Sequence, residues 1–404
     1  MGYFSLPILV SSQFWPCIKL ALAINSPNQK IHRILFVSAA DWAFQIHRLS
    51  LAKWLVEQGH KVAVICPPGE VTSELEKAGL KIFSMPLSRE RISATEILAS
   101  SKGIWKAVKE FEADILHCVS LRCILLGWIA TRSQANPPRI VNHVIGMGSI
   151  FSEEPTSLKM HGFRKMMDWS LKRAFRKPGT ITVFQNQDDK DWWSKQAKLR
   201  SEQVTCIAGS IDWKNDFHPE PGGPNRILYV GRMLRDKGIG ELIDAWSQLQ
   251  AAGSTVELYM CGAVDPGNPN SYTKSEVEAL VQERGFNWLG RRDDIPQQMA
   301  AAHMVVLPTY REGFPKVILE AGMAKRAVVA TDVAGCREIV EDQKTGLLVK
   351  SGEVKLLSEA MRKLLDDSSL RKCLAQNLYE RVQSEFSDSI INPQWEDLYA
   401  RIAK

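Results

Sequence analysis

The feature that most constrains the fold of this chain is a repeated alternation of short apolar runs with longer segments of helical periodicity. The apolar runs are rich in β-branched residues and are expected to form strands. In the first half of the chain these expected strands are 32–39, 61–66, 81–85, 114–118, 139–144 and 180–184. Strands that alternate with helices form parallel sheets covered on both faces, so the pattern predicts a doubly wound α/β architecture.

A stretch rich in proline and glycine, 217–224, interrupts this alternation. Such a composition is typical of a linker, and a second alternating series starts with the expected strand 226–230. A chain of 404 residues is also longer than one hydrophobic core usually serves. We therefore predict an N-terminal domain over 31–208, a linker over 209–225 and a C-terminal domain over 226–375.

Composition places the chain among globular proteins and narrows its partners. Hydrophobic residues make up 45% and charged residues 24%, as in soluble domains. A net charge of +6 does not indicate a nucleic-acid partner, but it is compatible with an anionic membrane surface or phosphorylated substrates. The eight cysteines include no CxxC pair, so we expect buried, reduced thiols of a cytoplasmic protein and no zinc site.

The first thirty residues, 1–30, form an extension whose status the sequence leaves open. Their apolar run is interrupted by Pro7, Pro16 and Lys19. These interruptions disfavour a spanning helix and a secretory signal. A membrane anchor, an interfacial or disordered extension and a mis-called start codon remain as alternatives.

The segment 310–322, which follows the expected strand 304–307, carries the strongest chemical signal. We expect Pro315 at the first helical position, where the unpaired N–H groups and positive dipole end of a helix suit a phosphate. Glu312 in the loop and Glu320 in the helix can accept hydrogen bonds from hydroxyl groups. A helix start between two glutamates suits a ligand with phosphates between hydroxyl-bearing rings, as in a nucleotide sugar.

Glu312 and Glu320, in the setting EGFP-x4-EA, resemble the retaining glycosyltransferases of family 4. Four further blocks of the C-terminal half agree with this family in order: 231–232 with 237–238, 288–291, 333–338 and 345–349. The resemblance implies two Rossmann-like domains that face each other across a cleft, the GT-B architecture. It also implies an N-terminal domain that binds the acceptor, a C-terminal domain that binds the donor, and last helices, 376–404, that pack back on the N-terminal domain.

The same resemblance assigns roles on the donor side. Two cations at one strand–helix turn, Arg232 and Lys237, can neutralise a diphosphate, and in similar enzymes this pair contacts the donor phosphates. Glu320 matches the position that holds the ribose, and Glu312 the position that holds the donor sugar. The expected donor-binding residues are Gly231, Arg232, Lys237, Gly290, Arg291, Glu312, Gly313, Phe314, Pro315, Lys316 and Glu320, with Gly290 and Arg291 near the nucleobase.

The expected catalytic residues are Glu312, Arg232 and Lys237. A retaining transfer through an oxocarbenium-like transition state depends on stabilising the departing diphosphate. The two cations and the helix start can supply this, so neither a metal nor a cofactor is expected. The acidic pairs 188–189 and 293–294 could suggest metal ligands, but their place at expected helix starts favours capping.

Blocks in the N-terminal half, 44–49, 87–89 and 142–148, resemble transferases that extend lipid-linked oligosaccharides. The acceptor-side candidates are Asp41, His47, Arg48, Arg89, His117, His143 and Gly146. His117 could instead be a strand-end residue, and His47 and Arg48 could make only local surface contacts. The glycine-rich turn of many relatives is replaced by 38–42, which offers no phosphate-binding nest.

The segment 158–177 places lysines and arginines beside apolar residues at helical spacing. Such a helix suits an anionic lipid surface, although an ordinary amphipathic helix with a charged solvent face would look similar. We therefore expect a cytoplasmic protein that lies on the inner face of the membrane.

The residues and the resemblance together predict a retaining transferase that uses a nucleotide sugar, with a UDP-sugar as the expected donor. The transferred group would be a hexose or an N-acetylhexosamine. The acceptor would be a lipid-linked saccharide on the way to a surface polysaccharide. A nucleotide-sugar epimerase of the same fold and a catalytically degenerate donor-binding protein are the alternatives.

Overall fold

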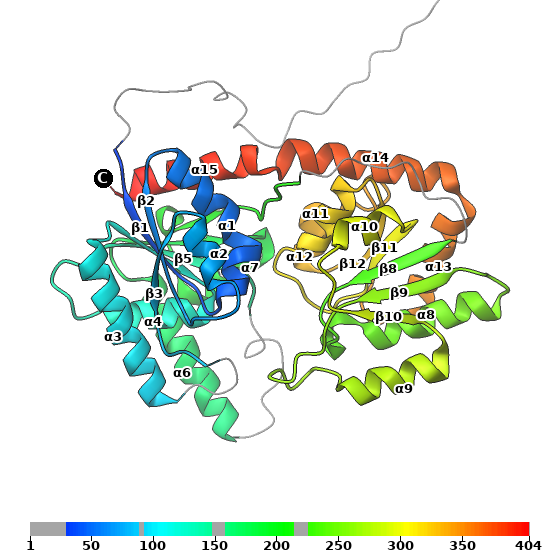
Figure 1. Ribbon diagram of the computed structural model, residues 1–404, viewed down its shortest axis with the longest axis horizontal. Coiled ribbons are helices and arrows are strands. Elements are labelled where there is room, and N and C mark those ends of the chain that lie inside the picture. The colour runs from blue at the N-terminus through cyan, green and yellow to red at the C-terminus, as the bar shows by residue number, and fades with distance from the viewer. Residues whose placement is uncertain (1–29, 89–92, 148–157, 214–224, 404) are drawn as a thin grey trace, which may run out of the picture. The chain divides into compact units, whose positions relative to one another are not determined.

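The strands form two parallel sheets in the computed structural model, which describes residues 30–88, 93–147, 158–213 and 225–403 (Figure 1). The first sheet has seven strands in the order β3-β2-β1-β4-β5-β6-β7, and the second has six in the order β10-β9-β8-β11-β12-β13. Every pairing between these strands is parallel. The extension 1–30 lies almost wholly outside the described residues.

The first sheet consists of β1 (Arg33–Val37), β2 (Lys61–Cys66), β3 (Lys81–Ser84), β4 (Ile115–Val119), β5 (Arg139–Val144), β6 (Thr180–Phe184) and β7 (Val204–Cys206). Residues of β1 alternate between two hydrophobic clusters: Leu35 and Val37 belong to one, and Ile34 and Phe36 to the other. Both faces of the strand are therefore buried, as expected of a parallel sheet between helices.

The helices of the first half are α1 (Asp41–Glu57), α2 (Thr72–Lys77), α3 (Ala94–Phe111), α4 (Leu121–Thr131), α6 (Leu158–Phe175) and α7 (Gln187–Ala197). Ser93 and Glu96 form a capping box that starts α3. Asn186 caps α7 by accepting a hydrogen bond from the backbone N–H of Asp189. The strand order reverses direction beside β1, which is where ligands bind in open sheets of this kind.

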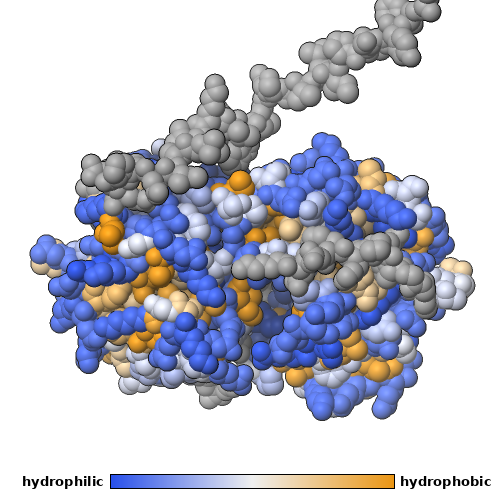
Figure 2. Space-filling model, turned by 45° about the horizontal axis from the view of Figure 1, so that its top comes forward, coloured by the Kyte–Doolittle hydropathy of each residue, from blue (hydrophilic) through white to orange (hydrophobic). Residues whose placement is uncertain are grey.

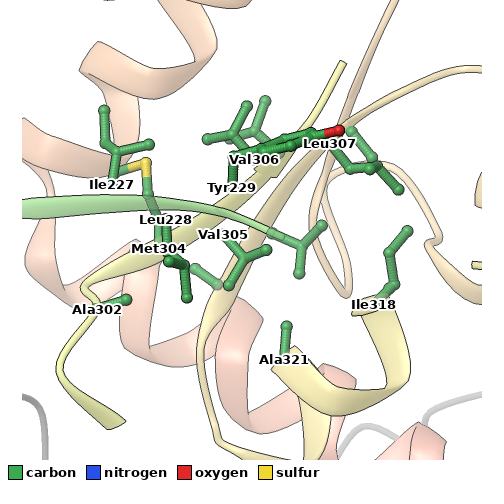
Figure 3. Close-up of a cluster of buried hydrophobic side chains, with 14 of the residues drawn as sticks. Ile227, Leu228, Tyr229, Ala302, Met304, Val305, Val306, Leu307, Ile318 and Ala321 are labelled. Atoms are coloured by element: carbon green, nitrogen blue, oxygen red, sulfur yellow. The ribbon is translucent and has the colours of Figure 1, made fainter. Parts of the chain in front are cut away.

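The second sheet consists of β8 (Arg226–Val230), β9 (Glu257–Cys261), β10 (Asn287–Gly290), β11 (Met304–Leu307), β12 (Ala327–Thr331) and β13 (Leu347–Val349). Its helices are η2 (Arg235–Lys237), α8 (Ile239–Ala251), α9 (Lys274–Arg284), α10 (Ile295–Ala300), α11 (Lys316–Met323), α12 (Ala334–Ile339), α13 (Val354–Asp366) and α14 (Ser368–Glu385). Ile318 and Ala321 of α11 belong to the same buried cluster as the strands β8 and β11 (Figure 3). This packing fixes the helix that carries Glu320.

The C-terminal segment divides between the two cores. Leu378 and Val382 of α14 are buried in the core of the second sheet. Trp395 and Tyr399 of α15 (Asp388–Ile402) are buried in the core of the first. The expectation that all of 376–404 packs back on the N-terminal domain is therefore wrong for α14, because its apolar stripe completes the second core. Only α15 makes the return.

Residues 32–404 form one compact unit, and the chain passes between its sheets at two places that bond to each other. The N–H of Ile211 donates to the carbonyl of Phe386 (3.1 Å), and the N–H of Asp388 donates to the carbonyl of Ile211 (3.2 Å). The prediction of two doubly wound domains is confirmed.

Five of the seven described cysteines are buried and none forms a disulfide, whereas Cys373 is exposed, contrary to expectation.

Candidate functional site

The turn after β11 brings the expected donor residues to the carboxyl edge of the second sheet. Its helix, α11, begins at Lys316, and Pro315 has the extended backbone of an N-cap residue (φ −75°, ψ 106°). The expectation of Pro315 as the first helical residue is therefore wrong by one position. Ile318 still donates its N–H to the Pro315 carbonyl (3.1 Å), so Pro315 precedes the helix and its carbonyl accepts a hydrogen bond from the first turn.

Lys237 and Glu312, predicted as parts of one site, are in direct contact. The Lys237 ammonium donates to Glu312 Oε1 at 2.7 Å and to the Arg311 carbonyl at 3.3 Å. Only 15% of the Lys237 side chain and 21% of the Glu312 side chain are exposed. The contact forms because the turns after β8 and β11 come from neighbouring strands.

Arg232, the second expected cation, has a different partner. Its guanidinium donates to Asp265 Oδ2 at 2.7 Å, and about half of its side chain is exposed. Asp265 follows β9 and was not predicted from the sequence. The preceding residue, Gly231, donates its N–H to the Cys261 carbonyl, so it joins the loops after β8 and β9.

The peptide groups at Glu312 and Gly313 are held from both sheets. The N–H of Gly335 donates to the Glu312 carbonyl (3.1 Å), and the Asn186 side chain donates to the Gly313 carbonyl (2.8 Å). A Cβ on Gly313 would lie 2.1 Å from the Ile145 carbonyl, and a Cβ on Gly335 would lie 2.6 Å from both carbonyls of the turn. Glycine is therefore required here because backbones approach closely.

Phe314 and Lys316 contact segments that are distant in the sequence. The ring of Phe314 meets Phe386 edge to face at 5.4 Å. The Lys316 ammonium donates to the carbonyl of Ile46 in α1 at 3.0 Å. The start of α11 therefore lies against the first helix of the chain, on the side where the acceptor candidates were expected.

Glu320 is half-buried, and burial raises its pKa while Lys316 opposes this shift. Among the described residues its carboxylate has no hydrogen-bond or ion-pair partner. Gly290 ends β10 at the sheet edge, and Arg291 beyond it is exposed and lies 3.7 Å from Asp293. In the sheet, β9 lies between β10 and β8, the strand that precedes Lys237.

Three of the acceptor candidates form one buried chain of hydrogen bonds with Tyr399. Arg48 Nη2 lies 3.0 Å from His143 Nε2, His143 Nδ1 lies 3.1 Å from His117 Nε2, and His117 Nδ1 lies 2.6 Å from the Tyr399 hydroxyl. All four side chains are almost completely buried. Arg48 also lies over the Trp395 ring, 5.8 Å from its centre.

The donor and acceptor of each of these hydrogen bonds follow from the guanidinium of Arg48, which can only donate. His143 must accept at Nε2 and therefore carries its proton on Nδ1. It donates to His117, which in turn donates to Tyr399. Burial, followed by the charge of Arg48, lowers the pKa of both histidines well below the ordinary value, so both are neutral. His117 is thus more than a strand-end residue, and Arg48 is not a surface residue.

The remaining acceptor candidates are placed differently. Asp41 is buried and accepts hydrogen bonds from the N–H of Trp42 and of Val71 and from the Thr72 hydroxyl, so it orders the loop after β2. His47 reaches solvent, although desolvation and the charges of Arg48 and Lys316 lower its pKa to about 3. Arg89 lies outside the described residues. Gly146 lies against Gly313, which brings the end of β5 to the turn after β11.

Comparison with known proteins agrees with both halves of this arrangement. The family model described as glycosyl transferases group 1 matches residues 211–381, and the one described as glycosyl transferase 4-like matches residues 33–177. The chain is a glycosyltransferase, with a group 1 match in its second half and a 4-like match in its first. The two matched ranges correspond to the second and the first sheet of the transferase.

A curated relative extends over nearly the whole transferase. The N,N'-diacetylbacillosaminyl-diphospho-undecaprenol alpha-1,3-N-acetylgalactosaminyltransferase of Campylobacter jejuni is 26% identical over 392 residues, which cover 92% of this chain and 99% of the relative.

Two solved structures share the fold at 20% identity. Sucrose-phosphate synthase from Thermosynechococcus elongatus has a TM-score of 0.75 over 92% of this chain and 99% of its own. Anabaena HepE in complex with UDP and glucose has a TM-score of 0.74 over 91% and 99%. The GT-B architecture is therefore confirmed. Figure 2 shows a hollow near the middle of the face of the transferase that it presents.

The acidic pairs are engaged with arginine or with the helix start. Asp188 pairs with Arg337 of α12, and Asp294 pairs with Arg292 at 2.6 Å. The cap of α7 is Asn186, two or three positions earlier than the expected pair 188–189. In the described part of the transferase no three His, Cys, Asp or Glu side chains are grouped so as to hold a metal ion.

Helix α6 leaves part of its apolar side uncovered. Met167 and Leu171 are buried, whereas Phe163, Met166 and Trp169 are 44%, 55% and 53% exposed. Trp169 meets Trp128 of α4 edge to face at 6.1 Å. None of the helices in the described ranges is both long enough and apolar enough to cross a membrane.

Sequence reasoning missed the partners that come from distant segments. Asp265, Asn186 and Tyr399 carry no motif of their own. The only available signal was position, since Asn186 precedes an expected helix directly after a strand, which is typical of a cap.

Proposed function

We propose that this transferase moves a hexose or an N-acetylhexosamine from a UDP-sugar to a lipid-linked saccharide, with retention of the anomeric configuration. The observation that carries the proposal is the contact between Lys237 and Glu312 beside the start of α11. This arrangement places a cation and helix N–H groups next to a carboxylate. It matches a donor with a diphosphate on one side and sugar hydroxyls on the other.

In the proposed reaction the bond between the anomeric carbon and the diphosphate breaks first, and negative charge develops on the leaving group. A hydroxyl oxygen of the acceptor then bonds to the same face of the anomeric carbon, and its proton passes to an oxygen of the departing diphosphate. Lys237 and the N–H groups of α11 stabilise this charge. Arg232 adds a second cation when the diphosphate competes with Asp265 for the guanidinium. Because these groups supply positive charge, the proposed transfer uses neither a metal nor a cofactor.

The carboxylates hold the two rings of the donor. Glu312 accepts a hydrogen bond from a sugar hydroxyl, while Lys237 keeps the carboxylate in place. Glu320 has no hydrogen-bond or ion-pair partner among the described residues, and its carboxylate accepts hydrogen bonds from the ribose hydroxyls. Arg291 lies near the nucleobase in this proposal.

The acceptor side is proposed from the position of Gly146 and from the relatives. Gly146 and Ile145 reach the turn after β11, so an acceptor between the sheets would meet the sugar there. The Campylobacter relative acts, by its name, on a diphospho-undecaprenol-linked sugar. HepE was solved with UDP and glucose. These names support a UDP-sugar donor and a lipid-linked acceptor in the synthesis of a surface polysaccharide.

A lipid-linked acceptor would be met at a membrane. We propose that the transferase is cytoplasmic and binds the anionic inner surface peripherally through α6. Phe163, Met166 and Trp169 would enter the interface. Lys165 and Arg173, exposed basic residues of 158–177, would face the lipid headgroups.

Thermal unfolding with UDP, GDP, ADP and their sugar conjugates tests the donor site. A ligand that binds only the folded state at about 100 times its Kd adds roughly 2.7 kcal/mol to the free energy of unfolding. We expect one UDP-sugar to stabilise the protein, and Glu320→Ala to remove that stabilisation. No response to any nucleotide would overturn the proposal.

Transfer itself is tested with the stabilising donor and a lipid-linked saccharide. Glu312→Ala should abolish product formation because the donor sugar and Lys237 both lose their partner. Transfer at the wild-type rate in this variant would contradict the role of Glu312. An isomerised donor sugar without any transfer would indicate an epimerase instead.

A further inference from the structure

We call residues 312–314, in the turn after β11, the donor turn. The carbonyl groups of Glu312 and Gly313 in this turn each accept a hydrogen bond. Gly335, at the start of α12, donates its N–H to the Glu312 carbonyl. Asn186, at the start of α7 in the first sheet, donates from its side chain to the Gly313 carbonyl. The turn is therefore held once by its own sheet and once by the opposite sheet.

These two contacts decide where the N–H groups of the turn point. All described peptide bonds are trans, and in a planar trans peptide the C=O and the following N–H point in opposite directions. With the Glu312 carbonyl directed at α12, the N–H of Gly313 points away from α12. With the Gly313 carbonyl directed at Asn186, the N–H of Phe314 points away from Asn186. Neither N–H donates to another described residue.

The orientation of the Asn186 amide is itself fixed. Its Oδ1 accepts the N–H of Asp189 at 2.7 Å, because the first turn of α7 needs an acceptor. Its Nδ2 must then face the Gly313 carbonyl at 2.8 Å and Asp189 Oδ2 at 2.9 Å. With 1% of its surface exposed, the side chain has no other arrangement.

The same two elements meet at two further places. Arg337 of α12 pairs with Asp188 of α7, and Glu338 of α12 accepts the backbone N–H of Gln187. The start of α7 therefore touches the donor turn and the helix that holds the other carbonyl of that turn. The contact between the sheets is built around Gly313 and not at a distance from it.

We propose that Asn186 is a positioning residue that orients the Gly313–Phe314 peptide toward the donor sugar. The inference rests on the proposed function. It assigns to the first sheet a part of donor recognition, because a second-sheet peptide takes its orientation from a first-sheet side chain. The sugar half of the donor is then recognised fully only while α7 contacts the turn. The nucleotide half, held by Glu320 and Lys237, is independent of Asn186.

Asn186→Ser separates the two roles of the side chain. Serine caps a helix about as well as asparagine, but its hydroxyl is too short to keep the contact with the Gly313 carbonyl as well. Gln187→Ala is the matched control, because it changes the neighbouring residue. Among the described residues the Gln187 side chain forms hydrogen bonds with Asp191 and Lys190, both in α7. Thermal unfolding of both variants shows whether α7 remains folded.

The readout is the affinity for UDP compared with that for UDP-glucose and UDP-N-acetylglucosamine, measured on the full chain by calorimetry. In Asn186→Ser we expect an unchanged Kd for UDP. We expect the Kd of the preferred UDP-sugar and its kcat/KM to worsen by about tenfold, since one or two hydrogen bonds to the sugar are lost. Gln187→Ala should behave as the wild type.

Equal weakening of UDP and UDP-sugar binding in Asn186→Ser would overturn the inference, since it would show general loss of the donor site. An unchanged preference for the UDP-sugar would also overturn it, while leaving the proposed function intact. Failure of the wild type to bind any UDP compound would instead overturn the proposed function and the inference together.

Discussion

At the scale of single residues, the buried hydrogen bonds that link Arg48 to Tyr399 show how a group that can only donate determines the protonation of its neighbours. The guanidinium determines the tautomer of His143, and His143 determines that of His117. Each histidine is therefore neutral and uses both ring nitrogens. Such an arrangement is stable only when every member is satisfied, because an unpaired buried polar group is costly.

This arrangement predicts a loss of stability in acid. The folded-state pKa values of His117 and His143 are lowered well below 6.5, so below pH 6.5 the unfolded chain takes up protons that the folded chain does not. The stabilisation is present above pH 6.5 and is lost as the pH falls. Between pH 7.5 and 5.5 each histidine should lower the free energy of unfolding by about 1 kcal/mol.

Urea denaturation at several pH values measures this dependence. His143→Gln should make the curve shallower by about the contribution of one histidine. His161→Gln, which changes an exposed histidine of α6, should not. A pH dependence that is the same in the wild type and in His143→Gln would contradict a neutral, buried His143.

At the scale of elements, α6 combines a packed side with an exposed apolar side. Met167 and Leu171 hold the helix on the first sheet, so residues on the opposite side can change without loss of the fold. If this side lies on lipid, Phe163→Ser/Met166→Ser should weaken binding to anionic vesicles several-fold at low salt. Pelleting with vesicles measures this directly.

Leu98→Ser on α3 is the matched control for this pair, because Leu98 is 56% exposed and lies on another helix. Its vesicle binding should equal that of the wild type. Equal binding of the wild type to neutral and anionic vesicles would contradict the electrostatic part of the proposal. A second salt concentration separates electrostatic attraction from the burial of apolar side chains, since only attraction between charges is screened by salt.

At the scale of the whole molecule, the first core depends on the last helix of the chain. Trp395 and Tyr399 are 1% and 0% exposed, and Trp395 packs on His117 and His143. A chain that ends at Phe386 would expose this side of the first sheet. It would also leave His117 without its tyrosine.

We therefore expect truncation after Phe386 to unfold the first sheet, whereas truncation after Ile402 should have little effect. Circular dichroism in the near ultraviolet and limited proteolysis distinguish the two. The second sheet should resist proteolysis in both chains, because its core is completed by α14. A fully folded first sheet in the shorter chain would show that α15 is dispensable.

The sequence by itself determined the local structure of the strands and the residue types of the turn after β11. Strands such as β5 and β8 follow from short apolar runs, and parallel sheets follow from their alternation with helices. That Lys237 and Glu312 lie at one edge of the second sheet was foreseeable because both residues follow strands, whereas their ion pair was not predicted.

Only the tertiary structure decided which distant groups are partners. Asp265 for Arg232, Asn186 for Gly313 and Tyr399 for His117 come from segments that carry no common pattern. The division of the C-terminal helices between two cores was equally hidden, since a helical apolar stripe does not specify which surface covers it. Periodicity is a property of neighbours along the chain, whereas a hydrogen-bond partner is chosen by proximity in space, which exists only once the sheets are packed.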